Sequence, residues 1–359
     1  MTRPELRPLT SLRGLAAWMV VLFHVRLAIA PSIGPTVMAV AAKGYLAVDF
    51  FFMLSGFVLW LNYEGRLRAG RVREWIDFFV RRLARIWPLH AAMLGVAAAL
   101  ALLFALTGRD TSNYPLAELP LHLALMQNWG FTHALSWNDP AWSISCELAA
   151  YLLLPAFTLL VNWRRVRASL LIGTLIGLAA LLHLVFTTSG ATTLGQNILQ
   201  LGVPRCLIEF TMGTVLCELW RRWKGRGLVA LCAVVASAAI GWIGLPEPLG
   251  IPLVFAGLLL AAAVIAEAPA NPLAVTPLHY LGDISYATYL SHVLLFRMFK
   301  LAFVSDASNV SLLAIGAFAV MVLIASVVLH HGLERPAQQW ILRRWRSHPP
   351  RRAGFVASR

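Results

Sequence analysis

Long apolar segments recur along almost the whole chain and dominate its pattern. Windows of about 20 apolar residues, the length with which a helix crosses the hydrocarbon core of a bilayer, occur ten times. They cover residues 10–30, 44–62, 86–107, 141–162, 168–187, 203–220, 227–244, 249–267, 278–300 and 310–332. The pattern predicts an all-α integral membrane protein in which about ten transmembrane helices form one bundle.

Basic residues between these segments predict how the helices are oriented. Of the 30 Lys and Arg, 24 fall in loops and termini that share one side of the membrane if the N-terminus is cytoplasmic. Because cytoplasmic loops are enriched in Lys and Arg, we expect a multi-pass protein of the cell inner membrane with both termini in the cytoplasm. The same distribution accounts for the net charge of +14, so we expect no nucleic-acid partner.

Composition supports the membrane interpretation. Hydrophobic residues make up 59% of the chain and charged residues 13%, and the mean hydropathy is +0.72, which excludes a soluble enzyme with one anchor. The four cysteines lie within the apolar segments and indicate no disulfide framework and no metal site. We expect one transmembrane domain over residues 1–340, in contact with membrane lipids, and a basic cytoplasmic tail over residues 341–359.

Ionisable residues within the apolar segments are the first candidates for function. Arg13 and His24 are eleven residues apart, so a helix places both on one face, roughly 16 Å apart along its axis. Asp49 and Glu147 fall in two other segments at about the depth of His24. Because such groups are costly in a membrane unless they line a polar cavity or meet a partner, His24, Asp49 and Glu147 are candidate catalytic residues. The alternative for each is a structural role.

Two stripes of polar side chains indicate a polar central cavity. Ser143, Glu147 and Tyr151 recur at the spacing of one helical face, and Ser285, Tyr289 and His292 do the same in a later segment. Ser143, Tyr151, Tyr289 and His292 are therefore candidates for the wall of this cavity. The alternative is that these side chains only form hydrogen bonds between helices.

A second group of candidates lies at the expected cytoplasmic edge. Arg82 and Arg85 are three residues apart and share a helical face just before the apolar segment 86–107. Two guanidinium groups beside the start of a helix would suit phosphate groups. We expect Arg82 and Arg85 to bind an anionic cytoplasmic ligand, while ordinary anchoring at lipid head groups is the alternative.

Six sequence segments, in order, resemble the signatures of membrane acyltransferase family 3. They extend from Leu9 to about Trp340 and read LTSLRGLAAWMVVLFH, GYLAVDFFFMLSGFVLW, RRLARIWP, NDPAWSISCELAAYLLLP, YLGDISYATYLSH and ERP. The family usually has Asp-Gly or a close variant before the Arg-Gly pair, whereas Thr10, Ser11 and Leu12 stand here. The fused esterase-like domain of larger members is absent from this sequence.

The resemblance implies an O-acyltransferase that uses no permanently bound cofactor. It implies transfer of an acyl group, most often acetyl, from cytoplasmic acyl-CoA to a hydroxyl, frequently of a surface polysaccharide sugar or its lipid-linked precursor. It also implies that Arg13, His24, Arg82, Arg85 and Glu147 occupy functional motif positions. No metal site is expected.

The chemistry needs a base, stabilisation of the tetrahedral intermediate and a site for the phosphates of the donor. We expect His24 to act as general base or to be acylated itself, and Asp49 or Glu147 to orient its imidazole. We expect Arg82 and Arg85 to bind the phosphates of the donor, and Arg13 either to bind the donor with them or to orient a neighbouring helix. Buried His, Asp and Glu also suit a proton relay, so a proton-coupled transporter or a flippase for lipid intermediates is the alternative function.

Overall fold

The computed structural model describes residues 6–268, 271–304 and 310–347, and in this part of the chain it is a bundle of α-helices without strands. The first helices are α1 (Arg7–Val25), α2 (Pro35–Ala42), α3 (Ala47–Leu67), α4 (Val72–Leu106), α5 (Leu119–Leu123), α6 (Ala141–Leu160) and α7 (Ala168–Thr188). They are followed by α8 (Ile198–Trp223), α9 (Gly227–Ile243), α10 (Glu247–Val264), α11 (Thr276–Asp283), α12 (Ser285–Phe303), α13 (Leu312–Leu329) and α14 (Arg335–Ser347). Short 3₁₀-helices cover Ala30–Ser32, Gly44–Leu46, Leu116–Glu118, Trp163–Arg165 and Pro272–Ala274, and a π-helical turn covers His330–Glu334.

The helical, membrane-spanning class predicted from the sequence is confirmed. Within the described ranges, seven helical stretches are long and apolar enough to cross a bilayer. They are Arg7–Val25, Pro35–Leu67, Val72–Leu106, Ala141–Leu160, Ala168–Thr188, Glu247–Val264 and Leu312–Ser347. Three further predicted segments form α8, α9 and α12, so the number of ten spans stays a prediction. The π-helical turn joins α13 to α14, which continues past residue 340, where we had placed the start of a separate tail.

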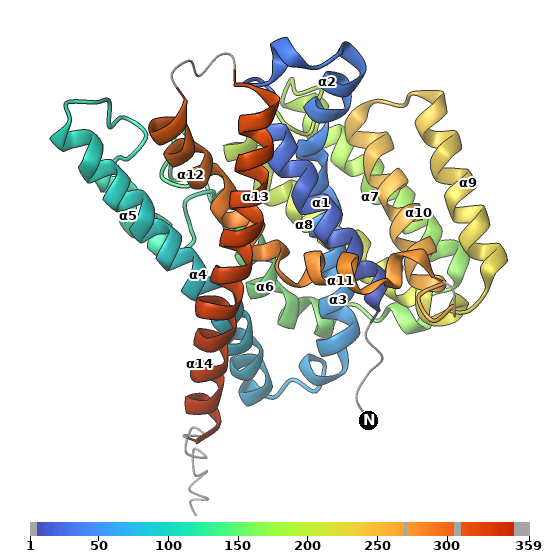
Figure 1. Cartoon of the computed structure of the whole chain (residues 1–359). Helices are drawn as coiled ribbons and strands as arrows, with labels where there is room; N and C mark the ends of the chain where they lie inside the picture. Colours follow the sequence, from blue (N-terminus) through green and yellow to red (C-terminus); the bar gives the residue numbers. More distant parts are fainter. Residues whose placement is uncertain (1–5, 269–270, 305–309, 348–359) are drawn as a thin grey trace, which may run out of the picture.

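One predicted span, residues 278–300, is wrong as a single helix, because the chain bends between α11 and α12 at Ile284. The side chains of Arg13 and Ser285 both donate hydrogen bonds to the carbonyl oxygen of Gly282, at distances of 2.6 to 3.1 Å. These contacts satisfy the hydrogen-bonding capacity of the Gly282 carbonyl group at the end of α11. In Figure 1, α11 accordingly runs across the bundle instead of along it.

Small residues allow the central helices to approach closely. A Cβ atom added to Gly56 of α3 would overlap the backbone of Phe210, and one added to Gly213 of α8 would overlap the backbone of Met53. Glycine is the residue that permits backbones of membrane helices to pack in this way. The pair α3 and α8 therefore forms the centre of the bundle, with α7, α9 and α10 on one side in Figure 1 and α4, α13 and α14 on the other.

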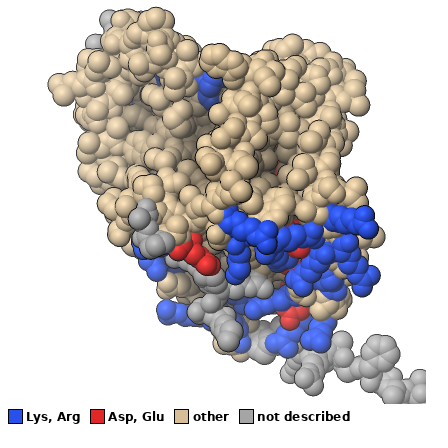
Figure 2. All heavy atoms as spheres, turned by 90° about the vertical axis from the view of Figure 1, so that its right-hand side faces the viewer, with Lys and Arg blue, Asp and Glu red and all other residues tan. Residues whose placement is uncertain are grey.

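Basic side chains gather at one end of the molecule, which we call the basic end. Figure 2 shows Lys and Arg in a band there, at the end toward which α14 points in Figure 1. Glu64, at the end of α3, forms ion pairs with Arg68, Arg164 and Arg221, at distances of 2.9, 2.6 and 3.6 Å. The end of α3, the 3₁₀-helix after α6 and the end of α8 are thus tied together at the basic end.

Candidate functional site

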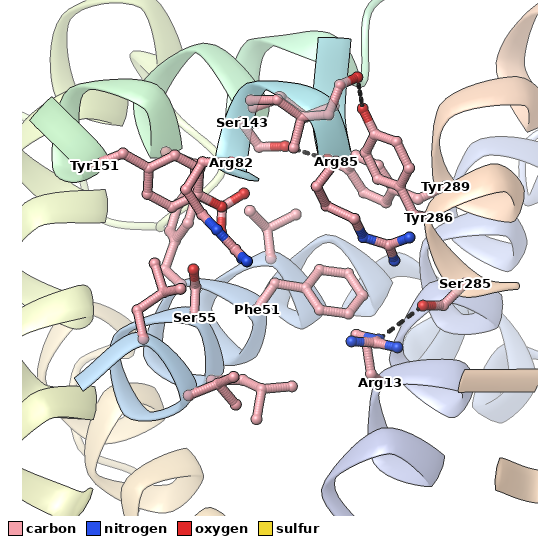
Figure 3. A pocket seen from close by; sticks show the side chains of 18 residues that line it. Arg13, Phe51, Ser55, Arg82, Arg85, Ser143, Tyr151, Ser285, Tyr286 and Tyr289 are labelled. Carbon is pink, nitrogen blue, oxygen red and sulfur yellow. Dashed lines mark hydrogen bonds between the residues drawn. The ribbon is translucent and has the colours of Figure 1, made fainter. Parts of the chain in front are cut away.

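A cavity of about 180 Å³ lies among α1, α3, α4, α6 and α12, and we call it the arginine cavity. Figure 3 shows the side chains of Arg13 of α1 and of Arg82 and Arg85 of α4 pointing into it. Its wall further includes Phe51, Ser55, Ser143, Glu147, Tyr151, Ser285, Tyr286 and Tyr289. The tertiary structure therefore brings together the three arginines and most of the polar stripe residues that the sequence singled out.

Arg82 carries an unused hydrogen-bond donor in the arginine cavity. Its Nη2 donates to the hydroxyl of Tyr63 at 3.1 Å, and its guanidinium lies 5.3 Å from the centre of the same ring. Its Nε is buried and has no hydrogen-bond partner among the described residues. A buried donor without a partner costs free energy, which an anionic group of a ligand in this cavity would recover.

Arg85 is held by a carboxylate that the sequence analysis had not singled out. Its Nη1 forms an ion pair with Glu334 of the π-helical turn, a buried side chain that also contacts His330 Nδ1 at 3.2 Å. Glu334 begins the ERP motif, so the signal was present in the sequence, but only the fold places this motif beside α4. Glu334 fixes the guanidinium of Arg85 and partly neutralises it.

The expected helix N-terminus beside Arg82 and Arg85 is wrong. α4 begins at Val72, so both arginines lie in the interior of a 35-residue helix whose backbone amides are bonded within the helix. The helix begins before the predicted segment 86–107 because the polar residues that precede Ile86 are also helical and extend α4 into the basic end. The arginine cavity therefore offers guanidinium groups, not backbone amides, to an anion.

Arg13 holds the wall of the arginine cavity in place through backbone contacts. Its Nε donates to Ser285 Oγ at 2.9 Å, and its Nη2 donates to the Gly282 carbonyl oxygen at 2.6 Å. The next residue, Gly14, packs so tightly on α11 that a Cβ there would lie 2.6 Å from the Gly282 nitrogen. The Arg-Gly pair thus combines a cavity-lining cation with the close helix contact that positions it.

Glu147 faces the arginine cavity between two hydroxyl groups. Ser55 of α3 and Tyr151 of α6 are within hydrogen-bonding reach of its carboxylate, and Arg82 and Arg85 act on it electrostatically. The structure thus places Glu147 beside the arginines. It does not place Glu147 beside His24, where it would orient the imidazole as the sequence analysis expects.

A second cavity of about 370 Å³ lies toward the end opposite the basic end, and we call it the histidine cavity. Its wall contains His24, Arg26, Tyr45, Val48, Asp139, Trp142, Thr193, Gln196, Arg205 and Tyr289. The wall combines aromatic rings with amide, hydroxyl and charged groups, the mixture typical of sites for polar organic molecules. His24 is therefore accessible from a different cavity than the one that the arginines line.

His24 contacts a second histidine. Its Nδ1 lies 2.9 Å from the carbonyl oxygen of Val20 and 3.1 Å from Nε2 of His292, and the two ring centres are 4.8 Å apart. His292 is fully buried, and its Nδ1 lies 3.2 Å from the carbonyl oxygen of Thr288. His292 does not line either cavity, in contrast to its expected place in the cavity wall.

Asp49 forms a buried ion pair with an arginine instead of orienting His24. Both oxygens of Asp49 accept hydrogen bonds from Arg205, at 2.6 Å each, and neither side chain is more than 3% exposed. The bidentate geometry is that of a strong charge-assisted contact. Arg205 also lines the histidine cavity, and Glu209, one helical turn further along α8, is fully buried beside this pair. The carboxylate on the wall next to His24 is that of Asp139, which pairs with Arg297 at 3.0 Å.

Tyr289 and Val48 belong to the walls of both cavities and so form the partition between them. The hydroxyl of Ser143 donates to the Pro140 carbonyl oxygen at 3.1 Å and lies 2.8 Å from the hydroxyl of Tyr289. Tyr289 is consequently the donor in the contact with Ser143, which holds its ring across the partition. Among the described residues, no group of three or more His, Cys, Asp or Glu is placed to hold a metal ion.

Comparisons with known proteins show which family the chain resembles. A family model described as an acyltransferase domain matches residues 9–331. The chain is 29% identical to the acyltransferase MdmB of Streptomyces mycarofaciens, over 95% of this chain and 93% of the relative. It is 27% identical to the exopolysaccharide production protein ExoZ of Rhizobium meliloti, over 85% and 91%.

A more distant relative is the peptidoglycan O-acetyltransferase OatA of Listeria monocytogenes, at 22% identity over 81% of this chain and 49% of the relative. No solved structure matches the chain significantly. The family model covers both cavities and every residue that the sequence singled out as a candidate. The chain therefore belongs to the membrane acyltransferase family 3.

Proposed function

We propose that the protein transfers an acyl group, acetyl in the first instance, from cytoplasmic acyl-CoA to a hydroxyl of a carbohydrate acceptor. The observation that carries this proposal is the pair of adjoining cavities, one lined by three arginines and the other by His24. The acceptor is a sugar of a surface polysaccharide or of its lipid-linked precursor. The names of ExoZ and OatA support a carbohydrate acceptor of this kind.

The donor enters from the basic end, which the excess of Lys and Arg assigns to the cytoplasm, in the inner membrane. Phosphate groups of acyl-CoA bind Arg82, with its free Nε, and the neighbouring Arg85. The arginine cavity is small, so it accommodates the narrow arm of the donor while the nucleotide remains at its mouth. The thioester then reaches the partition formed by Tyr289 and Val48.

The acceptor binds in the histidine cavity. The indole of Trp142 offers a flat apolar face to a sugar ring, while Gln196, Thr193 and Asp139 offer hydrogen bonds to its hydroxyl groups. The cavity lies at the end opposite the basic end, so a surface polysaccharide or a lipid-linked sugar reaches it from outside the cytoplasm. The partition separates this acceptor from the donor until the acyl group crosses.

His24 carries the proton in the transfer step. As general base, it takes the proton of the acceptor hydroxyl while the hydroxyl oxygen attacks the thioester carbonyl carbon. The C–S bond then breaks, and the leaving thiolate takes up the proton to give free CoA and the ester. In a second route, His24 attacks the thioester itself and passes the acyl group to the acceptor, with the same net balance.

The decisive experiment follows free CoA thiol and acetylated sugar with the purified protein, radiolabelled acetyl-CoA, and methyl glucoside and cello-oligosaccharides as hydroxyl probes. We expect His24→Ala to abolish sugar-dependent release of CoA while acetyl-CoA binding persists. His183→Ala on α7 is the matched control, because His183 lines neither cavity. If folded wild-type protein does not bind acetyl-CoA, the proposal is wrong, and the transporter interpretation becomes the better one. Turnover by His24→Ala would refute the role of His24.

A further inference from the structure

His292 is a fully buried titratable group next to His24, and the proposed reaction gives it no role. It sits on α12, one helical turn beyond Thr288, and its ring meets the ring of His24 edge to face. The contacts at the nitrogen atoms of the two imidazole rings define which nitrogen of each ring carries the proton.

The first contact fixes the protonation of His292. Its Nδ1 lies 3.2 Å from the carbonyl oxygen of Thr288. A backbone carbonyl oxygen only accepts hydrogen bonds, so Nδ1 is the nitrogen that carries the proton. In a neutral imidazole the other nitrogen then holds a lone pair. Nε2 of His292 is therefore an acceptor, and it points at Nδ1 of His24, 3.1 Å away.

The second contact fixes the protonation of His24 in the same sense. Its Nδ1 lies 2.9 Å from the carbonyl oxygen of Val20, which again only accepts. The proton on Nδ1 of His24 is thus shared between the Val20 carbonyl oxygen and Nε2 of His292. Among the described residues, both hydrogen-bonding contacts of this ring are at Nδ1. Because the ring also lines the histidine cavity, the unprotonated Nε2 is left for the substrate.

From this geometry we infer that His292 is a positioning residue that holds His24 in the tautomer with a free Nε2 and orients that nitrogen toward the acceptor. This inference rests on the proposed role of His24. His292 does here what a carboxylate does in a Ser-His-Asp triad: it accepts from the Nδ1–H group and stabilises the imidazolium that forms when Nε2 takes up a proton. The proton on Nδ1 stays in place throughout, so no additional reactant is required.

A hydrogen-bond acceptor without charge has a physical advantage beside Nδ1 of His24. A carboxylate beside His24 would bring a buried negative charge that needs its own partner, and Asp49 has such a partner in Arg205. A neutral imidazole accepts the hydrogen bond at a much smaller desolvation cost. The arrangement explains why His24 is paired with His292 and not with either carboxylate that we had considered.

The test compares two substitutions of His292 in the full-length protein. His292→Phe keeps an aromatic ring but has no atom that accepts a hydrogen bond. His292→Gln keeps a carbonyl oxygen that can accept a hydrogen bond from Nδ1 of His24. We expect His292→Phe to lower kcat by ~10- to 100-fold with an unchanged KM for acetyl-CoA, because one hydrogen bond to the imidazolium that forms in the transition state is lost. His292→Gln should recover most of the lost kcat.

A second measurement needs no turnover. In protein labelled with ¹⁵N-histidine, the imidazole signals of His24 are identified by their loss in His24→Gln, and we expect a protonated Nδ1 and an unprotonated Nε2. In His292→Phe the two tautomers should mix. Wild-type kcat in His292→Phe, or an unchanged tautomer of His24, would overturn the role of His292 while leaving that of His24 intact. An active His24→Ala variant would instead overturn the proposed function.

Discussion

The unpaired Nε of Arg82 permits a sharp test of donor binding. Arg82 and Arg81 are adjacent on α4, and each carries one positive charge, but only Arg82 lines the arginine cavity. Arg81 is bound to Asp77, with its Nε 2.7 Å from the carboxylate. Replacing either residue by Gln therefore lowers the net charge by one, and the comparison isolates the local contact from the general field of the basic end.

The magnitude follows from the kind of contact that is lost. A hydrogen bond to a charged group contributes about 1.5–3 kcal/mol. Since each 1.4 kcal/mol is a factor of ten, Arg82→Gln should weaken acetyl-CoA binding roughly 10- to 150-fold. The half-exposed position of Arg82 favours the lower part of this range. Arg81→Gln should change the dissociation constant by less than about threefold, because a one-unit change in net charge is screened by salt.

The assay is equilibrium binding of acetyl-CoA to detergent-solubilised protein, repeated at low and at high salt, with thermal unfolding of each variant as the control for folding. The difference between Arg82→Gln and wild type should shrink as salt is raised, since it arises from a contact with an anion. Equal affinities of Arg81→Gln and Arg82→Gln would refute the assignment of the donor phosphates to the arginine cavity.

Three further predictions follow from the geometry. Arg205→Met leaves the buried carboxylate of Asp49 without its cation and should destabilise the fold by about 3–5 kcal/mol, seen as a lower Tm in detergent; an unchanged Tm would contradict it. Tyr289→Ala should join the two cavities and raise acetyl-CoA hydrolysis without acceptor, whereas Tyr289→Phe keeps the partition and should not; equal hydrolysis by both would argue against a partition. Burial lowers the pKa of His122, in the segment between α4 and α6, to about 4, so between about pH 6.5 and 4 the unfolded chain takes up a proton that the folded chain does not. Tm should fall over this interval and fall less in His122→Gln, and parallel curves would refute this reasoning.

The number of membrane crossings is the part of the fold that the sequence predicted least sharply. Apolar length alone identifies α1, α6 and α7 well, because each is a continuous apolar helix between polar loops. It failed at residues 278–300, where contacts from Arg13 on a distant helix end α11. A window of hydropathy registers length and polarity, but it contains no information about which side chain reaches a backbone carbonyl from another helix.

The sequence by itself determined the class of the protein and most of the candidate residues. Hydropathy specifies membrane helices because a backbone inside the bilayer must satisfy its own hydrogen bonds. Because a charge inside the membrane is costly, the ionisable residues there are candidates for function, and they are Arg13, His24, Asp49 and Glu147. The motif order, in turn, identified the acyltransferase family that the family model confirms. None of these inferences depends on which helices are neighbours.

Only the tertiary structure decided which of these groups meet. Depth and helical face place His24, Asp49 and Glu147 at one level, but side chains at one level can face different neighbours around a bundle. The packing of α8 against α3 brings Arg205 to Asp49, and the turn after α13 brings Glu334 to Arg85. Two cavities with a shared wall, and the pairing of His24 with His292, result from that choice of neighbours, because hydrogen bonds and ion pairs act over only a few ångströms.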